Sequence, residues 1–255
     1  AGGELPRTTD QLRQAANAAR TGNWSVPTID TQAGIRSQYG AIGPVAVFGP
    51  NNFPLAFGSI SGGDFASAIA AGNPVIAKAN SSHPGTTELF ARCAHQAAQS
   101  TGMPAGMVQL IYRTSHIDGE RLVADARIGA TGYTGSRHAG LQLKAAADAA
   151  GKPIYLELSS VNPIVILPQA MEQQHEEIAT EFTSSCLMGT GQFCTNPGLV
   201  VVLKSDATDS FIAALSEQFS EAPVGTLLSS GVESSLESNL EILVNAGAEI
   251  VVGNT

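Results

Sequence analysis

The chain has 255 residues, of which 43% are hydrophobic and 14% are charged, and its formal net charge is -9. This composition predicts a globular protein and excludes a disordered one, and the length suffices for one large or two medium-sized domains. The acidic balance, without any lysine or arginine cluster, argues against a nucleic-acid partner or an anionic membrane surface. No apolar run has the length of a membrane span and no signal-peptide pattern opens the sequence, so we expect a cytoplasmic protein.

The cysteines and histidines predict no metal site. Cys93, Cys186 and Cys194 cannot all pair, and no CxxC spacing occurs, so a disulfide framework or a zinc centre is not expected. The five histidines are scattered and show no ligand spacing.

The first segment combines a helix with a long irregular stretch. Residues Thr8 to Arg20 start with polar residues and continue with alanine at helical spacing, which predicts a surface helix. Residues 22–40 carry few large apolar side chains, and a compact domain seldom contains so long a loop. The residues alone leave two interpretations open, an arm that docks on another subunit or a poorly ordered leader.

Strand and helix patterns alternate from residue 42 onward. Short apolar runs predict strands at 44–49, 74–79, 107–112, 127–133 and 153–158. Helical patterns follow these strands at 65–71, 83–100, 119–126 and 137–150. Such alternation predicts a doubly wound, mainly parallel α/β sheet that is covered on both faces and binds ligands at the carboxyl ends of its strands.

A second α/β region is expected from residue 161. Its predicted elements are strands at 163–167 and 199–204, helices at 178–188, 206–219 and 231–246, and a strand-like run at 249–253. We therefore expect two domains, over 1–160 and 161–255.

The glycine-rich segment 189–198, GTGQFCTNPG, contains the candidate nucleophile. Cys194 follows a helical pattern and stands among small and polar residues, and glycine lets the backbone approach a ligand closely. A reachable thiol beside free backbone N–H groups favours the nucleophilic thiolate. A buried structural cysteine is the alternative for any single Cys, but the composition of this loop favours the reactive interpretation.

Polar residues also follow the predicted strands. The adjacent amides of Asn51 and Asn52 suit an oxyanion, although Asn and Pro are common in ordinary turns. Lys78 and Ser81 suit a ribose or a phosphate, and a solvated strand end is the alternative. The strand-to-helix turn 131–136, TGYTGS, offers backbone N–H groups and a helix dipole to an anion. No GxGxxG fingerprint occurs in the sequence.

Glu157 lies inside the apolar run PIYLELSS. A carboxylate is costly in such a strand unless it has a partner or a role, so we expect a buried group. A general base and a hydrogen-bonded structural glutamate are equally weighted interpretations.

Together these segments resemble the aldehyde dehydrogenase superfamily. Four stretches match in the family's order: GPNNFP, VIAKANSSHP, TGYTGS with LELSS, and GQFCTNPG. The branch that oxidises 2-oxoglutarate semialdehyde (2,5-dioxopentanoate) is similar through GPVAVFG, GGDFASAIAAGNPVIAK and GQFCTNPG. The family's first strands and its C-terminal portion have no match, so we expect a partial chain.

The resemblance implies a role for each matching residue. Cys194 matches the nucleophile, Glu157 the general base, and Asn52 the amide that stabilises an oxyanion together with the Cys194 backbone N–H. The implied cofactor-binding residues are Lys78, Ser81, Gly119, Tyr133, Thr134, Gly135, Ser136 and Leu158. Ser81 stands where many NAD-preferring members carry an acidic residue, which favours NADP with NAD also accepted.

The resemblance further implies a Rossmann-like NAD(P)-binding domain over 1–160, with an oligomerisation arm over 26–41, and the N-terminal part of a catalytic domain over 161–255. It implies a homodimer or homotetramer that oxidises an aldehyde to a carboxylic acid through a thiohemiacetal and a thioester on Cys194. Three alternatives stay open: an NADP-binding fragment without turnover, a CoA-acylating relative, and a cysteine hydrolase. Glu157 argues against the CoA-acylating relatives, which commonly lack this base.

Overall fold

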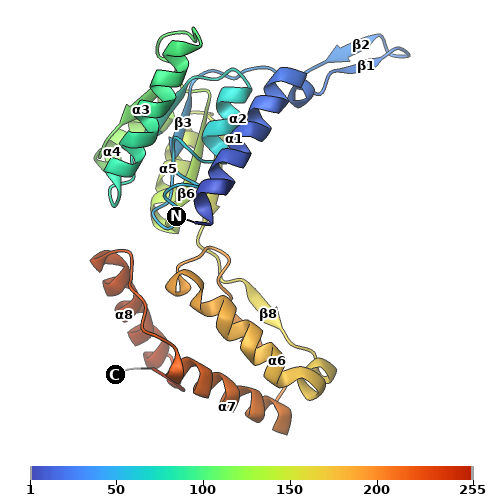
Figure 1. The fold of residues 1–255 in the computed structure, drawn as a ribbon, viewed down its shortest axis with the longest axis vertical. Helices are drawn as coiled ribbons and strands as arrows, with labels where there is room; N and C mark the ends of the chain where they lie inside the picture. The colour runs from blue at the N-terminus through green and yellow to red at the C-terminus, as the bar shows by residue number, and fades with distance from the viewer. Residues whose placement is uncertain (1, 254–255) are drawn as a thin grey trace. The chain divides into compact units, whose positions relative to one another are not determined.

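The computed structural model describes residues 2–253 and divides into two compact units, the first ending at Leu158 and the second beginning at Ser159 (Figure 1). Each unit has hydrophobic clusters of its own. Across residues 2–253, no helix is both long and apolar enough to cross a bilayer.

A five-stranded parallel sheet forms the centre of the first unit. Its strands are β3 (Val45–Phe48), β4 (Val75–Lys78), β5 (Val108–Ile111), β6 (Ala130–Gly135) and β7 (Ile154–Leu158). They are arranged in the order β5-β4-β3-β6-β7, with every pairing parallel. The order reverses between β3 and β6, and such a switch point opens a crevice at the carboxyl ends of the strands. The doubly wound sheet predicted from the sequence is confirmed.

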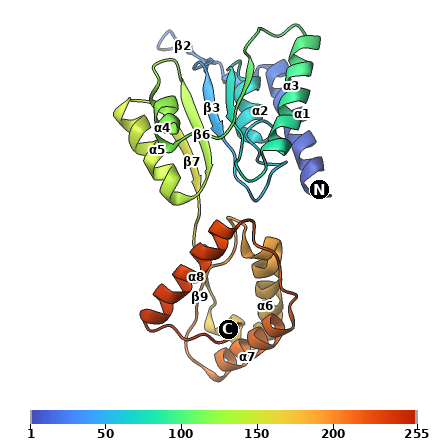
Figure 2. The same cartoon turned by 90° about the vertical axis from the view of Figure 1, so that its left-hand side faces the viewer.

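Helices cover both faces of this sheet (Figure 2). They are α1 (Glu4–Thr21), α2 (Gly63–Ala70), α3 (Pro84–Ser100), α4 (His116–Ala124) and α5 (Arg137–Ala149). On one face, α2 and α3 pack against Val47 and Ala77, and α1 packs on α2. On the other face, α4 and α5 pack against Phe48 and Tyr133. Because α4 is capped by the Ser115 hydroxyl, which accepts the Asp118 N–H, it begins before the predicted residue 119.

The expected irregular stretch over 22–40 contains regular structure, so that expectation is wrong in part. After a 3-10 turn (Asn23–Ser25), β1 (Thr28–Asp30) and β2 (Ile35–Ser37) form an antiparallel hairpin that extends past the end of α1 (Figure 1). The Asp30 carboxylate accepts the N–H groups of Gln32 and Ala33 at 2.9 Å each, and Gly34 takes φ +69°. This side-chain turn, rather than an apolar pattern, closes the hairpin, so hydrophobic periodicity gave no signal.

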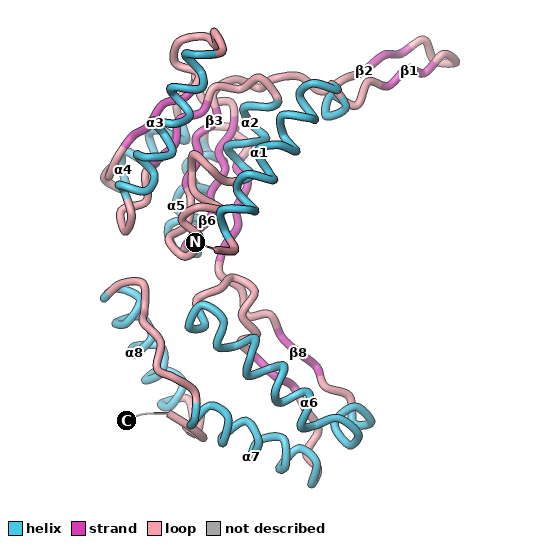
Figure 3. The backbone as a smooth tube through the Cα atoms, viewed as in Figure 1, coloured by secondary structure: helices cyan, strands magenta, loops and turns pink. Residues whose placement is uncertain are grey.

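Within its described residues, 159–253, the second unit contains a parallel pair of strands and the helices α6, α7 and α8 (Figure 3). Its elements are β8 (Pro163–Val165), α6 (Pro168–Leu187), a short 3-10 segment (Met188–Gly191), β9 (Leu199–Val201), α7 (Asp206–Glu221) and α8 (Ser230–Asn245). Ile166, Met171, Ala179 and Phe211 form its core. The strand predicted over 249–253 is wrong, because these apolar residues are exposed and pair with no described strand.

Candidate active site

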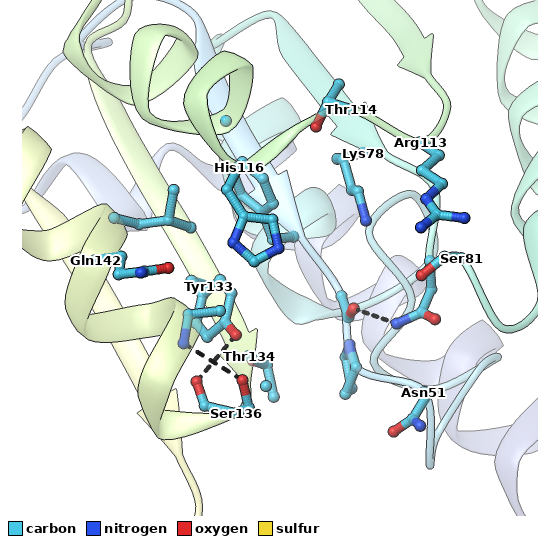
Figure 4. Close-up of a pocket in the computed structure, with 18 of the residues that line it drawn as sticks. Asn51, Lys78, Ser81, Arg113, Thr114, His116, Tyr133, Thr134, Ser136 and Gln142 are labelled. Atoms are coloured by element: carbon cyan, nitrogen blue, oxygen red, sulfur yellow. Dashed lines mark hydrogen bonds between the residues drawn. The ribbon is translucent and has the colours of Figure 1, made fainter. Parts of the chain in front are cut away.

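A cavity of about 740 Å³ lies at the carboxyl ends of β3, β4, β5 and β6 (Figure 4). Its size falls within the range of small-molecule sites, about 300–1,000 Å³. Seven of the residues predicted to bind a cofactor line it: Lys78, Ser81, Gly119, Tyr133, Thr134, Gly135 and Ser136. Parallel strands bring these separate sequence segments to one edge of the sheet, as the motif positions predicted.

The turn from β6 into α5 forms one wall of the cavity. Ser136 caps α5, its hydroxyl accepting the Ala139 N–H at 3.4 Å, and the Tyr133 hydroxyl donates to the Ser136 carbonyl at 3.0 Å. A Cβ on Gly135 would be 2.7 Å from the Tyr133 hydroxyl oxygen, so glycine is needed for this fit. The uncapped N–H groups and the dipole of α5 give this wall a positive potential suited to an anion.

Cationic side chains line the opposite part of the cavity. Lys78 is half-buried, and burial lowers the pKa of its ammonium, with the nearby Arg113 charge as the second cause. Figure 4 shows Lys78, Arg113 and Ser81 on the same side of the cavity, across from Ser136. Arg113 was not predicted from the sequence, although it comes directly after a predicted strand, the same kind of position that pointed to Lys78.

Leu158 is the exception among the predicted cofactor residues. Its side chain packs on α5, where a Cβ on Gly140 would be 2.5 Å from Leu158 Cδ2 and 3.0 Å from Tyr133 Cε1. It belongs to the core beneath the cavity and is not among the residues that line it. Gly140 therefore lets β7 and Tyr133 approach the first turn of α5.

The loop that carries Asn52 is held by α1. The Glu4 carboxylate accepts the N–H groups of Leu55 and Ala56 at 3.0 Å each. The side-chain amide of Gln11 donates to the carbonyls of Ala56 and Ser61 at 2.8 and 2.9 Å. Asn52 itself is half-buried, and its neighbour Asn51 lines the cavity. No sequence motif pointed to this support, because Glu4 and Leu55 are far apart in the chain.

Glu157 is exposed, so the expectation of a buried carboxylate is wrong. The reason is the strand order, which makes β7 an edge strand. Its residues Leu156 and Leu158 face α5, whereas Tyr155, 68% exposed, and Glu157 alternate to the other face. Strand order is a tertiary property that the apolar run PIYLEL does not contain.

Cys194 lies in the second unit on an anchored loop, with its side chain exposed. The Ser160 hydroxyl and the Asn162 side-chain amide donate to the Cys194 carbonyl at 2.8 and 2.7 Å, and Asn162 also donates to the Asn196 carbonyl at 2.9 Å. Asn162 holds φ +49°, a left-handed conformation that asparagine tolerates better than most residues. Two polar side chains therefore fix the backbone and leave the thiol accessible.

The neighbouring cysteine, Cys186, has a different environment. It is partly buried at the end of α6, burial raises the pKa of its thiol, and its sulfur lies 3.6 Å from the Pro197 carbonyl oxygen. A raised thiol pKa disfavours the thiolate of Cys186, and its partial burial also limits access to its sulfur. Phe193 fits against Gly189, where any Cβ would overlap its ring. This contact explains why glycine stands at position 189, the first residue of the segment 189–198 that carries Cys194.

A comparison with known families gives the context for these residues. The family model described as "Aldehyde dehydrogenase family" matches residues 1–254. The chain belongs to the aldehyde dehydrogenase family. The chain is similar to the alpha-ketoglutaric semialdehyde dehydrogenase 2 of Azospirillum brasilense, with 42% identity over 241 residues, which are 90% of this chain and 46% of the relative. The corresponding enzyme of Acinetobacter baylyi is 38% identical over 95% of this chain and 48% of the relative.

Solved structures of other dehydrogenases share the fold. The glyceraldehyde-3-phosphate dehydrogenase of Methanocaldococcus jannaschii, complexed with NADP, matches with a TM-score of 0.82 at 21% identity, over 98% of this chain and 55% of that one. The succinic semialdehyde dehydrogenase of Streptococcus pyogenes, also with NADP, gives 0.77 at 23% identity, over 98% and 55%. The chain spans about half the length of the curated relatives it matches.

Proposed function

We propose that this chain carries the nucleotide-binding unit and the nucleophile of an NAD(P)-dependent aldehyde dehydrogenase that converts an aldehyde to a carboxylic acid. The observation that carries the proposal is the exposed thiol of Cys194, held on a loop whose backbone is tied by Ser160 and Asn162. Membership of the aldehyde dehydrogenase family supports it. The first unit is the proposed nucleotide-binding domain, and the second is the beginning of the catalytic domain.

The cavity of the first unit fits a phosphorylated dinucleotide. Its lining supplies the Lys78 ammonium, the Arg113 guanidinium, the Ser81 hydroxyl and the amide end of α5, a donor set that suits ribose hydroxyls and phosphate oxygens. Ser81 brings no negative charge that would repel a 2′-phosphate, and Arg113 adds a positive one. We therefore assign NADP as the preferred cofactor, with NAD also accepted. When bound, such a cofactor would supply the acceptor for the hydride, one proton with two electrons, that the thiohemiacetal loses.

In the proposed reaction, Cys194 attacks the aldehyde carbon to form a thiohemiacetal, and its oxyanion is stabilised by the Asn52 amide and the Cys194 N–H. Loss of hydride converts this adduct to a thioester on Cys194. Glu157 then removes a proton from water, which attacks the thioester and releases the carboxylic acid and the Cys194 thiolate, and the proton on Glu157 passes to solvent. The exposure of both Cys194 and Glu157 within their own units leaves each of them accessible to substrate and water.

The proposed substrate is 2-oxoglutarate semialdehyde. The support is the naming of the relatives from Azospirillum brasilense and Acinetobacter baylyi, together with the coverage of this chain by both. The proposed location is cytoplasmic.

The proposed oligomer is a homodimer or homotetramer that uses the hairpin of β1 and β2. Two apolar side chains of the hairpin are exposed, Ile29 at 65% and Ile35 at 61%, and Tyr39, two residues after β2, is 69% exposed. Exposed apolar side chains on a projecting hairpin are typical of a contact with a partner. Light scattering on Ile29→Asp compared with wild type tests this assignment, and an unchanged mass would count against the hairpin as the contact.

The activity test measures NADPH formation with 2-oxoglutarate semialdehyde and with simple aldehydes. It is run on this chain and on the chain completed to the length of its relatives, each as wild type and Cys194→Ser. We expect turnover in the completed wild type and near-complete loss in Cys194→Ser. Activity of the serine variant at the wild-type rate would contradict the assignment.

The same assay tests two of the three alternatives that the sequence left open. Binding of NADP without NADPH formation in the completed protein would identify a non-catalytic binding protein. A rate that depends on added coenzyme A, with an acyl-CoA product, would identify a CoA-acylating enzyme. For a CoA-acylating enzyme, Glu157→Gln would leave the rate unchanged. For the proposed dehydrogenase, we expect Glu157→Gln to block hydrolysis of the thioester and so the release of the acid.

A further inference from the structure

His83 is the N-cap residue of α3, but its side chain makes no hydrogen bond that caps the helix. Its Nε2 instead lies 3.1 Å from the backbone carbonyl oxygen of Pro50, in the turn that follows β3. A carbonyl oxygen only accepts hydrogen bonds, so Nε2 carries a proton and donates it to this contact. The imidazole is therefore bonded to a turn about thirty residues earlier in the chain, and not to the helix that it precedes.

The other ring nitrogen of His83 shows that this position is not chosen to suit α3. Nδ1 is buried and has no hydrogen-bond partner within residues 2–253. Leaving a buried polar atom unpaired costs free energy, whereas serine, threonine or asparagine at an N-cap would bond to the first turn of the helix. The contact with Pro50 is thus what histidine provides here and an ordinary capping residue does not.

Two further hydrogen bonds join the same two segments of the chain. The Asn80 side-chain amide donates to the Gly49 carbonyl at 3.1 Å, and its Oδ1 accepts the Ser82 N–H at 2.9 Å. The Ser59 hydroxyl donates to the Lys78 carbonyl at 2.9 Å. The turn after β3 is therefore bonded at several points to the turn that joins β4 to α3.

The segment held in this way, residues 49–54, carries Asn52. Pro50 and Asn51 line the nucleotide cavity, whereas His83 is not among the residues that line it. His83 therefore meets the site through the backbone of Pro50, two residues before Asn52. The direction of the Pro50 carbonyl sets the course that the chain takes as it leaves β3.

We propose that His83 is a positioning residue for Asn52: its Nε2–H holds the Pro50 carbonyl and so fixes the segment 49–54 with the Asn52 amide where the oxyanion forms. This inference rests on the proposed function, which gives Asn52 its role. A donor that is aimed in advance at a developing charge needs no rearrangement during the reaction, and a small displacement of a reacting group lowers the rate steeply. His83 acts on turnover through Asn52 and touches neither substrate nor cofactor.

The first test measures backbone order parameters of residues 51–53 by ¹⁵N NMR on this chain. In His83→Ser the hydroxyl can cap α3 but cannot reach Pro50, whereas the side-chain amide nitrogen of His83→Gln takes the place of Nε2. We expect order parameters near 0.85 in wild type and His83→Gln and a fall toward about 0.6 in His83→Ser.

His95→Ser is the matched control, because His95 is exposed on the same helix, and it should keep the wild-type order parameters. Equal values in wild type and His83→Ser would overturn the proposal. A segment as mobile in His83→Gln as in His83→Ser would overturn it as well, since the donor would then be irrelevant.

The second test measures turnover in the completed enzyme. We expect His83→Ser to lower kcat by about 10-fold or more with little change in KM, and His83→Gln to restore most of the loss. In an Asn52→Ala background, His83→Ser should have no further effect, because the group that it positions is gone. The same fold-loss in both backgrounds would overturn the positioning role. The order parameters need no activity, so their fall in a protein that oxidises no aldehyde would support the contact and contradict only the proposed function.

Discussion

The Ser160 hydroxyl donates a hydrogen bond of 2.8 Å to the backbone carbonyl of Cys194. Ser160 lies in the segment LELSS, and the aldehyde dehydrogenase motif that this segment resembles commonly has glycine at that position. The serine therefore adds a hydrogen bond that supports the loop of residues 189–198, which carries Cys194. We expect Ser160→Gly to speed amide hydrogen exchange in residues 193–198 and to lower stability by about 1 kcal/mol or less, since the bond is exposed. Ser210→Gly, on the exposed face of α7, is the control for the loss of a serine hydroxyl, and equal exchange rates in 193–198 in both variants would contradict the support.

Asn162 offers a comparison of side chain and backbone. Asn162→Ala and Asn162→Gly both remove the bonds to the Cys194 and Asn196 carbonyls. Only alanine is strained at φ +49°, so we expect Asn162→Ala to be less stable than Asn162→Gly by about 1 kcal/mol. Urea unfolding of both variants measures the difference, and a glycine variant that is the less stable of the two would contradict the backbone argument.

Gly132→Ala tests the close packing of α2 on β6. The added Cβ meets the Asp64 carboxyl group at 2.7 Å, so we expect a loss of about 1–3 kcal/mol in the free energy of unfolding. The double variant Gly132→Ala with Asp64→Ala is expected to recover part of that loss. Gly85→Ala is the control, because its added Cβ meets nothing within 4 Å. If the double variant recovers none of the lost free energy of unfolding, the added Cβ does not clash with the Asp64 carboxyl group.

Two aspartates of the first unit predict opposite pH effects on stability. Desolvation and, second, the negative charge of Glu157 raise the pKa of Asp64 in the folded state. At pH values above the ordinary pKa of Asp, the folded state therefore binds more protons at this site than the unfolded state does. An ionised Asp64 consequently lowers the stability of the folded state at neutral pH. Hydrogen bonds from Arg127 lower the pKa of Asp125 well below its usual range, so ionised Asp125 contributes stability that is lost as the pH falls. We expect Asp64→Asn to stabilise and Asp125→Asn to destabilise at pH 7. Thermal unfolding measures the stability difference between each variant and wild type, and both differences should shrink below pH 3. If the two variants changed stability in the same direction at pH 7, the opposite pKa directions of Asp64 and Asp125 would be contradicted.

Arg113 is expected to discriminate between the two nicotinamide cofactors. Replacing it by Gln removes one cation from the side of the cavity that holds Lys78 and Ser81. We expect Arg113→Gln to weaken NADP binding by about 10- to 100-fold, the size of one charge-assisted bond, and NAD binding by much less. Calorimetric titration with both cofactors gives the ratio. Arg36→Gln, in the hairpin, is the matched control, and an equal loss for NAD and NADP would remove Arg113 from cofactor selection.

The sequence indicated where the residues of the proposed cofactor site lie, but it did not indicate the residues that support the loops of that site. Residues such as Lys78, Tyr133 and Ser136 lie directly after apolar strands, and the carboxyl ends of parallel strands converge whatever the side chains around them. Arg113 followed the same rule and was overlooked. The supports from Glu4 and Gln11 on α1 could not be predicted in this way, because they depend on how that helix packs against a loop distant in the chain.

By itself the sequence determined the alternation of strands and helices, the parallel sheet and the cysteine loop, because these follow from local periodicity and from glycine and polar residues at fixed offsets from a strand. Only the tertiary structure decided that β7 is an edge strand, which exposes Glu157, and that α2 lies over Gly132, which brings the Asp64 carboxyl group against β6. Strand order and helix packing depend on the complementary fit of surfaces from distant segments, and that fit is not encoded in any single stretch.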